Sequence, residues 1–237
     1  MMKPGSKSKK NAPGGWNWKK IVIVVFCIAF AALMVVSSLG FGWLESLKEV
    51  KAGDTIMLSY TVRDAQGSPV ITTNQMLYNQ TIEKGNVAFL AAPLKVVTNA
   101  TTIKEIFPLE VFMRTIAGYQ PLFYALFGPE YNSITGGIAG LRQGETKQIS
   151  LQGEENFSQM MTVEEFEQIG GNYSQAVVGK QMLIGFSMDP EAETGNTTSP
   201  QSTVSRVARI NAKTDGGIIL DYGLDVVEVT VVEVNPR

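Results

Sequence analysis

A long uncharged run near the start of the chain constrains the fold most. Residues 21–44 read IVIVVFCIAFAALMVVSSLGFGWL. At about 1.5 Å per residue, a helix of this length crosses the roughly 30 Å hydrocarbon core of a membrane. A cleaved signal peptide is the alternative, but its apolar region is usually shorter and ends in small residues. Because this run is long and ends in Gly40, Phe41, Gly42 and Trp43, we predict an uncleaved transmembrane anchor.

The residues on either side of the run predict its orientation. All three tryptophans flank it, at positions 16, 18 and 43, as in the aromatic belts of membrane helices. Residues 1–20 contain no acid, and their basic residues are Lys3, Lys7, Lys9, Lys10, Lys19 and Lys20. Because basic flanks stay in the cytoplasm, we expect a single-pass protein of the cell membrane. Residues 1–20 would form the cytoplasmic tail, and residues 45–237 would lie outside.

Potential glycosylation sites agree with an extracytoplasmic body. The motif Asn-x-Ser/Thr begins at Asn79, Asn99, Asn156, Asn172 and Asn196. Such motifs also arise by chance in polar segments, so the alternative is that none of them is glycosylated. We expect at least some of them to be glycosylated in a secreted or surface setting.

Composition excludes several classes of chemistry. The whole chain has a net charge of −2, with the positive charge concentrated in residues 1–20 and an acidic remainder. An acidic body argues against nucleic acid as a partner. The chain has no histidine, and its one cysteine, Cys27, lies in the apolar run. We therefore expect no disulfide, no metal site, no cofactor and no His- or Cys-dependent catalysis in the body.

The body reads as an α+β domain with an antiparallel sheet. We expect helices near Pro108, within an apolar stretch over 103–128, and from Thr162 to Gly170. Residues 74–104 are expected to form a surface excursion, and 189–200 a polar loop. The predicted strands are 55–64, 70–73, 146–152, 180–188, 202–212, 216–222 and 224–234.

The stretch GGIAGLRQGETKQISL, residues 136–151, looks like a phosphate-binding loop but does not meet the requirements of one. Gly144 is followed by Glu145 rather than by the lysine of a P-loop, and a strand rather than a helix follows the glycines. The remaining interpretation is a helix end with left-handed glycines that leads into a strand.

Three ordered blocks resemble FKBP-type peptidyl-prolyl isomerases. The opening of the family resembles residues 50–73, VKAGDTIMLSYTVRDAQGSPVITT. Its G-L-x-G-M-x-x-G-E segment resembles residues 136–151, and its closing strand resembles residues 227–234, VEVTVVEV. Matching positions are Val50, Gly53, Asp54, Tyr60, Gly67, Gly137, Ile138, Gly140, Leu141, Gly144, Glu145 and Leu151. The resemblance covers about 90 residues.

The resemblance implies a curved antiparallel sheet around a short helix, with a proline pocket between them. An apolar pocket that favours the twisted amide could lower the barrier of about 18–20 kcal/mol without a nucleophile or acid. Carried over position by position, the pocket residues are Tyr60, Ile71, Thr72, Tyr131, Ile134, Phe157 and Val227. Tyr60 matches the pattern. Ile71 and Thr72 replace a Phe-Asp pair, Glu130 and Tyr131 a Val-Ile pair, Ile134 a tryptophan, Phe157 a tyrosine and Val227 a phenylalanine.

Two insertions complete the expected organisation. Residues 74–130 lengthen the segment before the helix, and residues 158–222 resemble the insert-in-flap chaperone domain of one prokaryotic and archaeal branch of the family. The FKBP-like part would then be 45–157 with 223–237. Candidate contacts for unfolded clients are Met160, Met161, Phe166, Met182 and Met188, whose alternative role is to form the insert's own core.

Three functions follow from these expectations. The first is an anchored, extracytoplasmic isomerase that acts on proline-containing polypeptides and assists the folding of exported proteins. The second is a client-binding module or chaperone that has the fold but little or no catalysis. The third is a structural protein of the cell surface.

Overall fold

The computed structural model describes residues 18–38, 48–151, 157–187 and 203–236, in two units that are treated separately below: residues 1–45 and residues 46–237. In the first unit, helix α1 spans Trp18–Ser38. Its stretch Trp18–Val35 has a mean hydropathy of 2.3, and none of it is buried. The helix is long and apolar enough to cross a membrane. It begins three residues before the predicted anchor, and residues 39–44 lie outside the described part.

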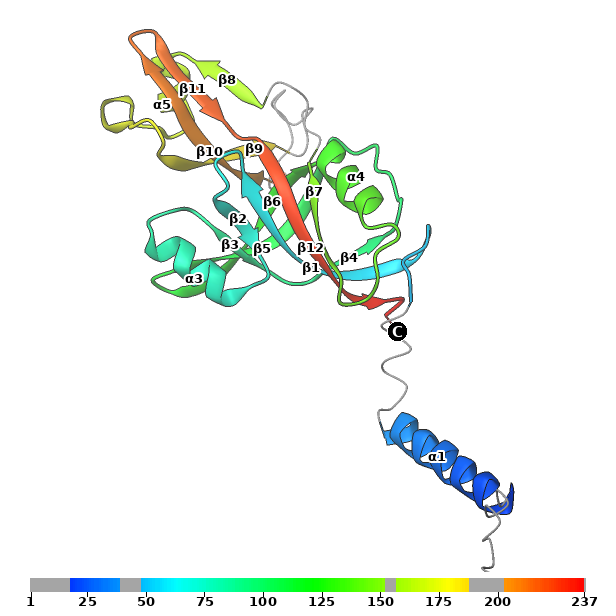
Figure 1. Ribbon diagram of the computed structural model, residues 1–237. Coiled ribbons are helices and arrows are strands. Elements are labelled where there is room, and N and C mark those ends of the chain that lie inside the picture. Colours follow the sequence, from blue (N-terminus) through cyan, green and yellow to red (C-terminus); the bar gives the residue numbers. More distant parts are fainter. Residues whose placement is uncertain (1–17, 39–47, 152–156, 188–202, 237) are drawn as a thin grey trace, which may run out of the picture. The chain divides into compact units, whose positions relative to one another are not determined.

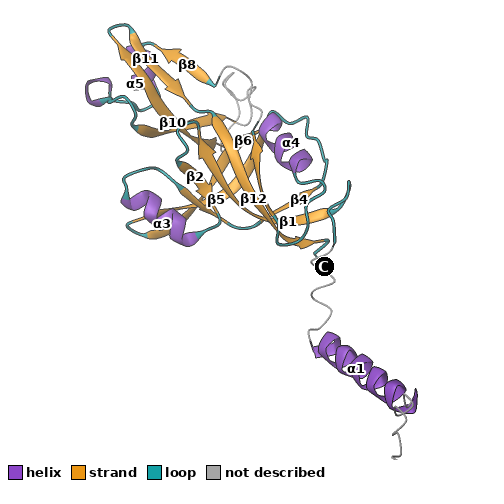
Figure 2. Cartoon of the chain, in the orientation of Figure 1, coloured by secondary structure: helices purple, strands orange, loops and turns teal. Residues whose placement is uncertain are grey.

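The second unit, the body, is built mostly from strands (Figures 1 and 2). Its strands are β1 (Thr55–Asp64), β2 (Pro69–Thr72), β3 (Phe89–Ala91), β4 (Leu94–Val97), β5 (Ile106–Thr115), β6 (Gly118–Phe127), β7 (Thr146–Ser150), β8 (Ser158–Met161), β9 (Gln181–Ser187), β10 (Thr203–Thr214), β11 (Gly217–Asp221) and β12 (Leu224–Val234). Its helices are α3 (Gln75–Glu83), α4 (Gly128–Gly137), α5 (Val163–Gln168) and the 3-10 turn η1 (Tyr173–Gln175).

The strands form one curled, mixed sheet. The order along it is β7-β12-β1-β2-β3-β5-β6-β10-β11-β8, with β4 paired to β1 and β9 to β10. Most pairs are antiparallel, but β2 pairs with β3 and β6 with β10 in parallel. The structure therefore confirms a sheet in the body, but the sheet is mixed rather than purely antiparallel. Both parallel pairs involve the residues between 74 and 130, so the longer segment changes the sheet itself.

The main hydrophobic core lies on one face of this sheet, where alternate residues of the strands point inward. β1 pairs with β12 along almost its whole length, with Val62 opposite Val227. Helix α4 packs beside the strands and contributes Ile134 to the core. The glycine-rich stretch behaves as expected: α4 ends at Gly137, Gly140 and Gly144 have positive φ values of 81° and 84°, and β7 follows.

A second hydrophobic cluster lies within residues 158–222. It contains Phe166, Ala176, Ile184, Ala208, Ile210, Ile218 and Leu220. Helix α5 begins at the capping box predicted there, in which the Thr162 hydroxyl accepts from the Glu165 N–H and the Glu165 carboxylate accepts from the Thr162 N–H. The segment is not separate from the rest of the body, because Val207 on β10 belongs to the main core. Its assignment as an inserted domain stays a prediction.

The helix predicted near Pro108 is wrong. Residues 106–127 form the hairpin of β5 and β6, which turns between Thr115 and Gly118. The apolar spacing that suggested a helix also fits a strand, because every second residue from Phe107 to Met113 belongs to the core cluster or packs against it. Proline interrupts a helix but is tolerated in a strand where one edge of that strand is unpaired. Pro108 and Pro121 stand at such points, because β3 and β10 pair with other residues of the hairpin.

The surface excursion predicted for residues 74–104 is also wrong. Asn74 caps helix α3 by accepting from the Met76 and Leu77 N–H groups. β3 and β4 follow and join the main sheet, where Phe89 is fully buried. The segment's abundance of Asn and Thr comes from caps and turns rather than from an irregular loop. The loop predicted over 189–200 lies outside the described residues.

Candidate functional site

Four of the seven predicted proline-pocket residues are buried in the main hydrophobic core. Tyr60, Ile71, Ile134 and Val227 belong to the main hydrophobic cluster, and each is at most 4% exposed. Tyr131 is half-buried and stacks on Phe107, with ring centroids 4.5 Å apart. A proline side chain cannot enter positions from which even water is excluded, so these residues offer no open hollow.

Residues from the segment 74–130 fill the space beside them. Phe89, Val111, Tyr124 and Leu126 are buried in the same cluster as the four pocket positions. Phe89 and Tyr124 meet edge to face at 5.6 Å. Thr72 is buried too, and its hydroxyl shares a hydrogen bond of 2.8 Å with that of Thr61.

Phe157 lies apart from these residues, in a cluster of four half-buried rings. The rings of Phe127 and Phe157 are stacked at 5.1 Å with an angle of 12° between their planes. Phe186 meets Phe127 at 5.8 Å, and Tyr222 meets Phe157 at 5.7 Å, both edge on. These distances fall in the range in which aromatic pairs stabilise each other by about 0.5–1.5 kcal/mol beyond area burial. We call the site formed by these four residues the aromatic cleft.

Two adjoining hollows open onto these rings. One, of about 320 Å³, includes Ile103, Phe127, Pro129, Asn132 and Phe157 in its lining. The other, of about 600 Å³, includes Ile106, Phe186, Ser187 and Tyr222. They share Lys104, Glu105 and Phe127. The walls therefore combine aromatic rings with polar and charged side chains, and both kinds of group occur in ligand-binding sites.

The wall formed by residues 102–105 is held against the start of α4. Asn132 accepts from the Thr102 N–H and donates to the Thr102 carbonyl, and the Gly128 N–H donates to the Glu105 carbonyl at 2.9 Å. A side chain at Gly128 would bring its Cβ to 2.5 Å from the Lys104 carbonyl oxygen. Glycine is therefore required here because the two backbones approach so closely.

A buried ion pair contacts Phe127 of the aromatic cleft. Arg206 on β10 and Glu130 on α4 are both completely buried and form a two-pronged pair, with N–O distances of 2.6 and 2.9 Å. Arg206 also donates to the carbonyls of Ala125 and Tyr222, and Glu130 accepts from the Phe127 N–H. The guanidinium lies 4.3 Å from the centre of the Phe127 ring.

Burial and charge act in opposite directions on these groups. Burial by itself would lower the pKa of Arg206, but the neighbouring Tyr124 and Glu130 outweigh it and raise that pKa above its usual value. Burial raises the pKa of the Tyr124 phenol to about 12. Arg206 therefore stays charged and the Tyr124 phenol neutral across the physiological range.

The predicted client contacts divide between core and surface. Phe166 is 2% exposed in the second hydrophobic cluster, and Met161 and Met182 pack against that cluster. Met160 is 63% exposed. Met188 lies outside the described residues. Three of the five thus form the insert's own core, which the sequence analysis left open.

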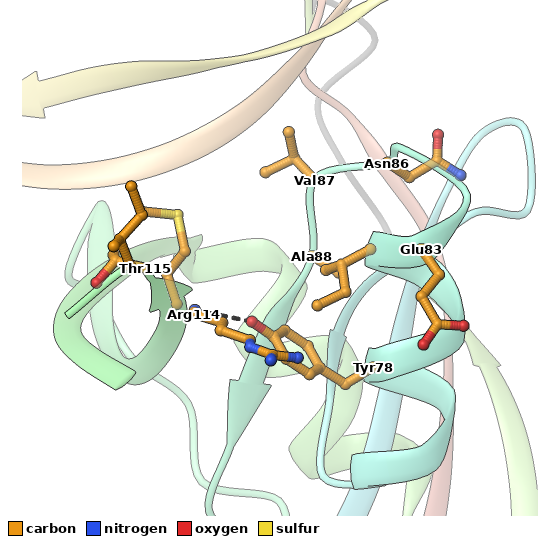
Figure 3. Close-up of a pocket in the computed structure, with 10 residues that line it drawn as sticks. Tyr78, Glu83, Asn86, Val87, Ala88, Arg114 and Thr115 are labelled. Atoms are coloured by element: carbon orange, nitrogen blue, oxygen red, sulfur yellow. Dashed lines mark hydrogen bonds between the residues drawn. The ribbon is translucent and has the colours of Figure 1, made fainter. Parts of the chain in front are cut away.

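A third hollow, of about 720 Å³, lies between α3 and the tip of the β5–β6 hairpin (Figure 3). The hydroxyl of Tyr78 accepts from the Arg114 N–H at 2.8 Å, as the dashed line in Figure 3 shows. Tyr78 itself is buried, so its hydroxyl is engaged in holding α3 to the hairpin rather than free for a ligand.

Sequence reasoning found one ring of the aromatic cleft, Phe157, and did not connect it with the others. The four rings stand at positions 127, 157, 186 and 222, so no local spacing links them. The one signal available was that Phe127, Phe186 and Tyr222 each lie at or near the end of a predicted apolar stretch or strand. The partner of Glu130 could not be found either, since Arg206 is 76 positions away.

The arrangement presents aromatic faces together with the polar side chains of Lys104, Glu105 and Asn132. Among the described residues no three acids, cysteines or histidines are grouped as metal ligands. No protein-family model matches the chain, and no curated protein matches it.

Proposed function

We propose that the body is a polypeptide-binding module that helps exported proteins to fold and is held at the outer face of a membrane by α1. The observation that carries this proposal is the aromatic cleft, with four half-buried rings beside two hollows. Apolar side chains and prolines of an unfolded chain pack well against aromatic faces. A rigid support such as the pair of Glu130 and Arg206 lowers the entropy lost on binding.

Peptide binding to the intact protein tests this proposal. The full chain, in lipid nanodiscs, would be titrated into a fluorescein-labelled peptide that alternates leucine with serine, and its anisotropy recorded. Phe157→Ala and Phe186→Ala should each weaken binding about tenfold, as expected for central aromatic contacts. Ile169→Ala, at an exposed apolar residue of the insert, should leave binding unchanged. Absence of binding by the wild-type chain, or equal affinity in all variants, would refute the proposal.

A second candidate is peptidyl-prolyl isomerisation by a divergent FKBP-type domain. Phe157, which stands where the resemblance places the flap tyrosine, faces a hollow bordered by the start of α4. Binding at this cleft could position a proline next to the helix and favour its twisted amide. The same nanodisc preparation would be assayed with a proline-containing model peptide. A rate equal to the uncatalysed one, from protein that still binds peptide, leaves the binding function and removes the enzymatic one. A chain with neither activity would favour the structural alternative.

A further inference from the structure

The register of the β5–β6 hairpin aligns the aromatic cleft with a second apolar strip. Alternate residues of β6 share one face, so Tyr119, Pro121 and Phe123 point to the same side of the strand as Phe127. Tyr119 is 45% and Phe123 52% exposed, and Pro121 is exposed as well. We call Tyr119, Pro121 and Phe123 the hairpin strip.

Ala125 separates the hairpin strip from the cleft. It is fully buried, and its carbonyl accepts from Arg206. The site is therefore two apolar patches on one strand face rather than one unbroken surface. Four residues lie from Phe123 to Phe127, which corresponds to about 13 Å along a strand.

The neighbouring strand adds charge on the same face. Register places Phe112 opposite Pro121, Arg114 opposite Tyr119 and Glu110 opposite Phe123. Phe112 is half-buried and extends the apolar area, whereas Arg114 and Glu110 are exposed. Within the described parts of the chain, neither of these two charges forms an ion pair. An acidic group of a ligand near Tyr119 would therefore meet a free guanidinium.

The edge of β6 beside the hairpin strip has no strand neighbour among the described residues. β5 pairs along the full length of β6, whereas β10 pairs with the other edge of β6 at Ser205 and Tyr124. Backbone groups on the edge from Gly118 to Phe123 are left without a ladder partner. An unpaired edge next to apolar side chains suits another chain in extended conformation.

From these observations we infer that the hairpin strip and the aromatic cleft together hold one extended polypeptide segment. The segment has apolar side chains at every second position and an acidic group at the end near Arg114. Tyr119 and Phe127 are eight residues apart, or about 26 Å, so an extended segment of about eight residues spans both patches. This inference rests on the proposed polypeptide binding at the cleft and specifies the length and pattern of what is bound.

Peptide length is the discriminating variable. Two labelled peptides would be titrated with the full chain in nanodiscs, a tetrapeptide and a nonapeptide, each alternating leucine with serine and each carrying aspartate at both ends. The nonapeptide should bind at least tenfold more tightly, because a linked second contact is gained at high effective concentration. Phe123→Ser should abolish this advantage, and Arg114→Glu should reduce it severalfold. Neither variant should change the affinity of the tetrapeptide.

Val178→Ser, at another exposed apolar residue, is the matched control and should leave both affinities unchanged. Circular dichroism of each variant would establish that it is folded. Equal affinity of the two peptides for the wild-type chain, or an advantage that survives Phe123→Ser, would overturn the inference while the binding of the tetrapeptide still supports the cleft. Failure of both peptides to bind would overturn the inference together with the proposed function.

Discussion

At the scale of single residues, Tyr60 is a position that the resemblance assigns to a pocket and that the structure buries in the core. Tyr60 is 4% exposed in the main core, and its hydroxyl finds no hydrogen-bond partner among the described residues. Burial raises the pKa of this phenol well above its ordinary value of 10. A buried hydroxyl without a partner does not stabilise the fold, because its hydration is lost and nothing replaces it.

Replacement of Tyr60 by phenylalanine should therefore be neutral or stabilising below pH 9. Above pH 10 the unfolded chain ionises its tyrosine while the folded chain does not, so the wild type loses about 1.4 kcal/mol of stability per pH unit through this group. Tyr60→Phe should remove that part of the alkaline slope in urea denaturation. Tyr173→Phe is the contrast, since the Tyr173 hydroxyl donates to the Thr214 carbonyl and its loss should cost about 1 kcal/mol. An unchanged alkaline slope in Tyr60→Phe would contradict this reading.

The potential glycosylation sites differ in their surroundings. Asn99 is exposed in a turn with φ of 58°, whereas Asn79 is half-buried in α3 and accepts from Gln75, and its motif's Thr81 is buried. Asn172 is exposed, but its side chain caps η1. Asn156 and Asn196 lie outside the described residues.

We expect Asn99 to be the most fully occupied of the three described sites, because only there are both the side chain and the turn open to solvent. Mass spectrometry of the protein from a host that glycosylates exported chains measures this, with Asn99→Gln as the control for assignment. Equal occupancy at Asn79 and Asn99 would show that folded-state exposure does not decide modification here.

At the scale of elements, the two glycines that end α4 have different roles. A Cβ at Gly137 would lie 2.6 to 2.9 Å from three side-chain atoms of Ile149 on β7, whereas a Cβ at Gly136 would meet nothing within 4 Å. Gly137 thus lets the helix approach the sheet, and Gly136 only lowers the helix's propensity.

Substitution by alanine should separate these roles. Gly137→Ala should destabilise the body by about 1–3 kcal/mol through overpacking, and Ile149→Val in the same chain should recover part of the loss. Gly136→Ala, the matched control one residue away, should stabilise it by about 0.5–1 kcal/mol. Urea denaturation measures both, and a stabilising Gly137→Ala would show that Ile149 can move aside without loss.

The pair of Glu130 and Arg206 joins α4 to β10 and should tolerate joint but not single replacement. Arg206→Met leaves a buried carboxylate without its cation, which should cost about 3–5 kcal/mol, and Glu130→Leu should have a similar effect. The double variant should regain most of this loss, because two apolar side chains need no compensation. A double variant as unstable as the sum of the two single ones would mean that the pair is not coupled energetically.

At the scale of the whole molecule, the arrangement proposed for the membrane depends on charge. We expect residues 1–20, with six lysines and no acid, to stay in the cytoplasm while the body is exported. Protease added outside intact cells should degrade the body and spare an epitope placed before residue 1. Permeabilised cells provide the control, in which both should be degraded. Loss of the epitope with survival of the body would reverse the orientation.

Sequence patterns predicted the elements well where one period dominated. β1, β9 and β12 lie where strands were predicted, and the capping box of α5 is formed as expected. The failure at residues 106–127 has a physical reason, since apolar residues stand on both faces of this hairpin. Both the helical and the strand period then fit, and only pairing with β3 and the packing of Leu109 and Val111 decide between them.

The candidate site was predictable only in part. The resemblance assigned Tyr60, Ile71, Ile134 and Val227 to one site, and all four are buried in the main hydrophobic cluster of the body. It could not indicate that Phe89 and Tyr124, from a segment with no counterpart in the pattern, would fill the space beside them. A list of aligned positions specifies which residues meet, whereas openness depends on every other side chain in the vicinity.

The sequence by itself determined an apolar helix of membrane-spanning length, a β-rich body and the ends of α4 and α5. These are local properties, because hydrophobic period, caps and left-handed glycines act within a few residues. Tertiary structure alone decided that the pattern's pocket is closed, and that rings from positions 127, 157, 186 and 222 form a cleft instead. The reason is that sheet order brings distant segments side by side, and the ion pair that fixes the cleft joins residues 76 positions apart.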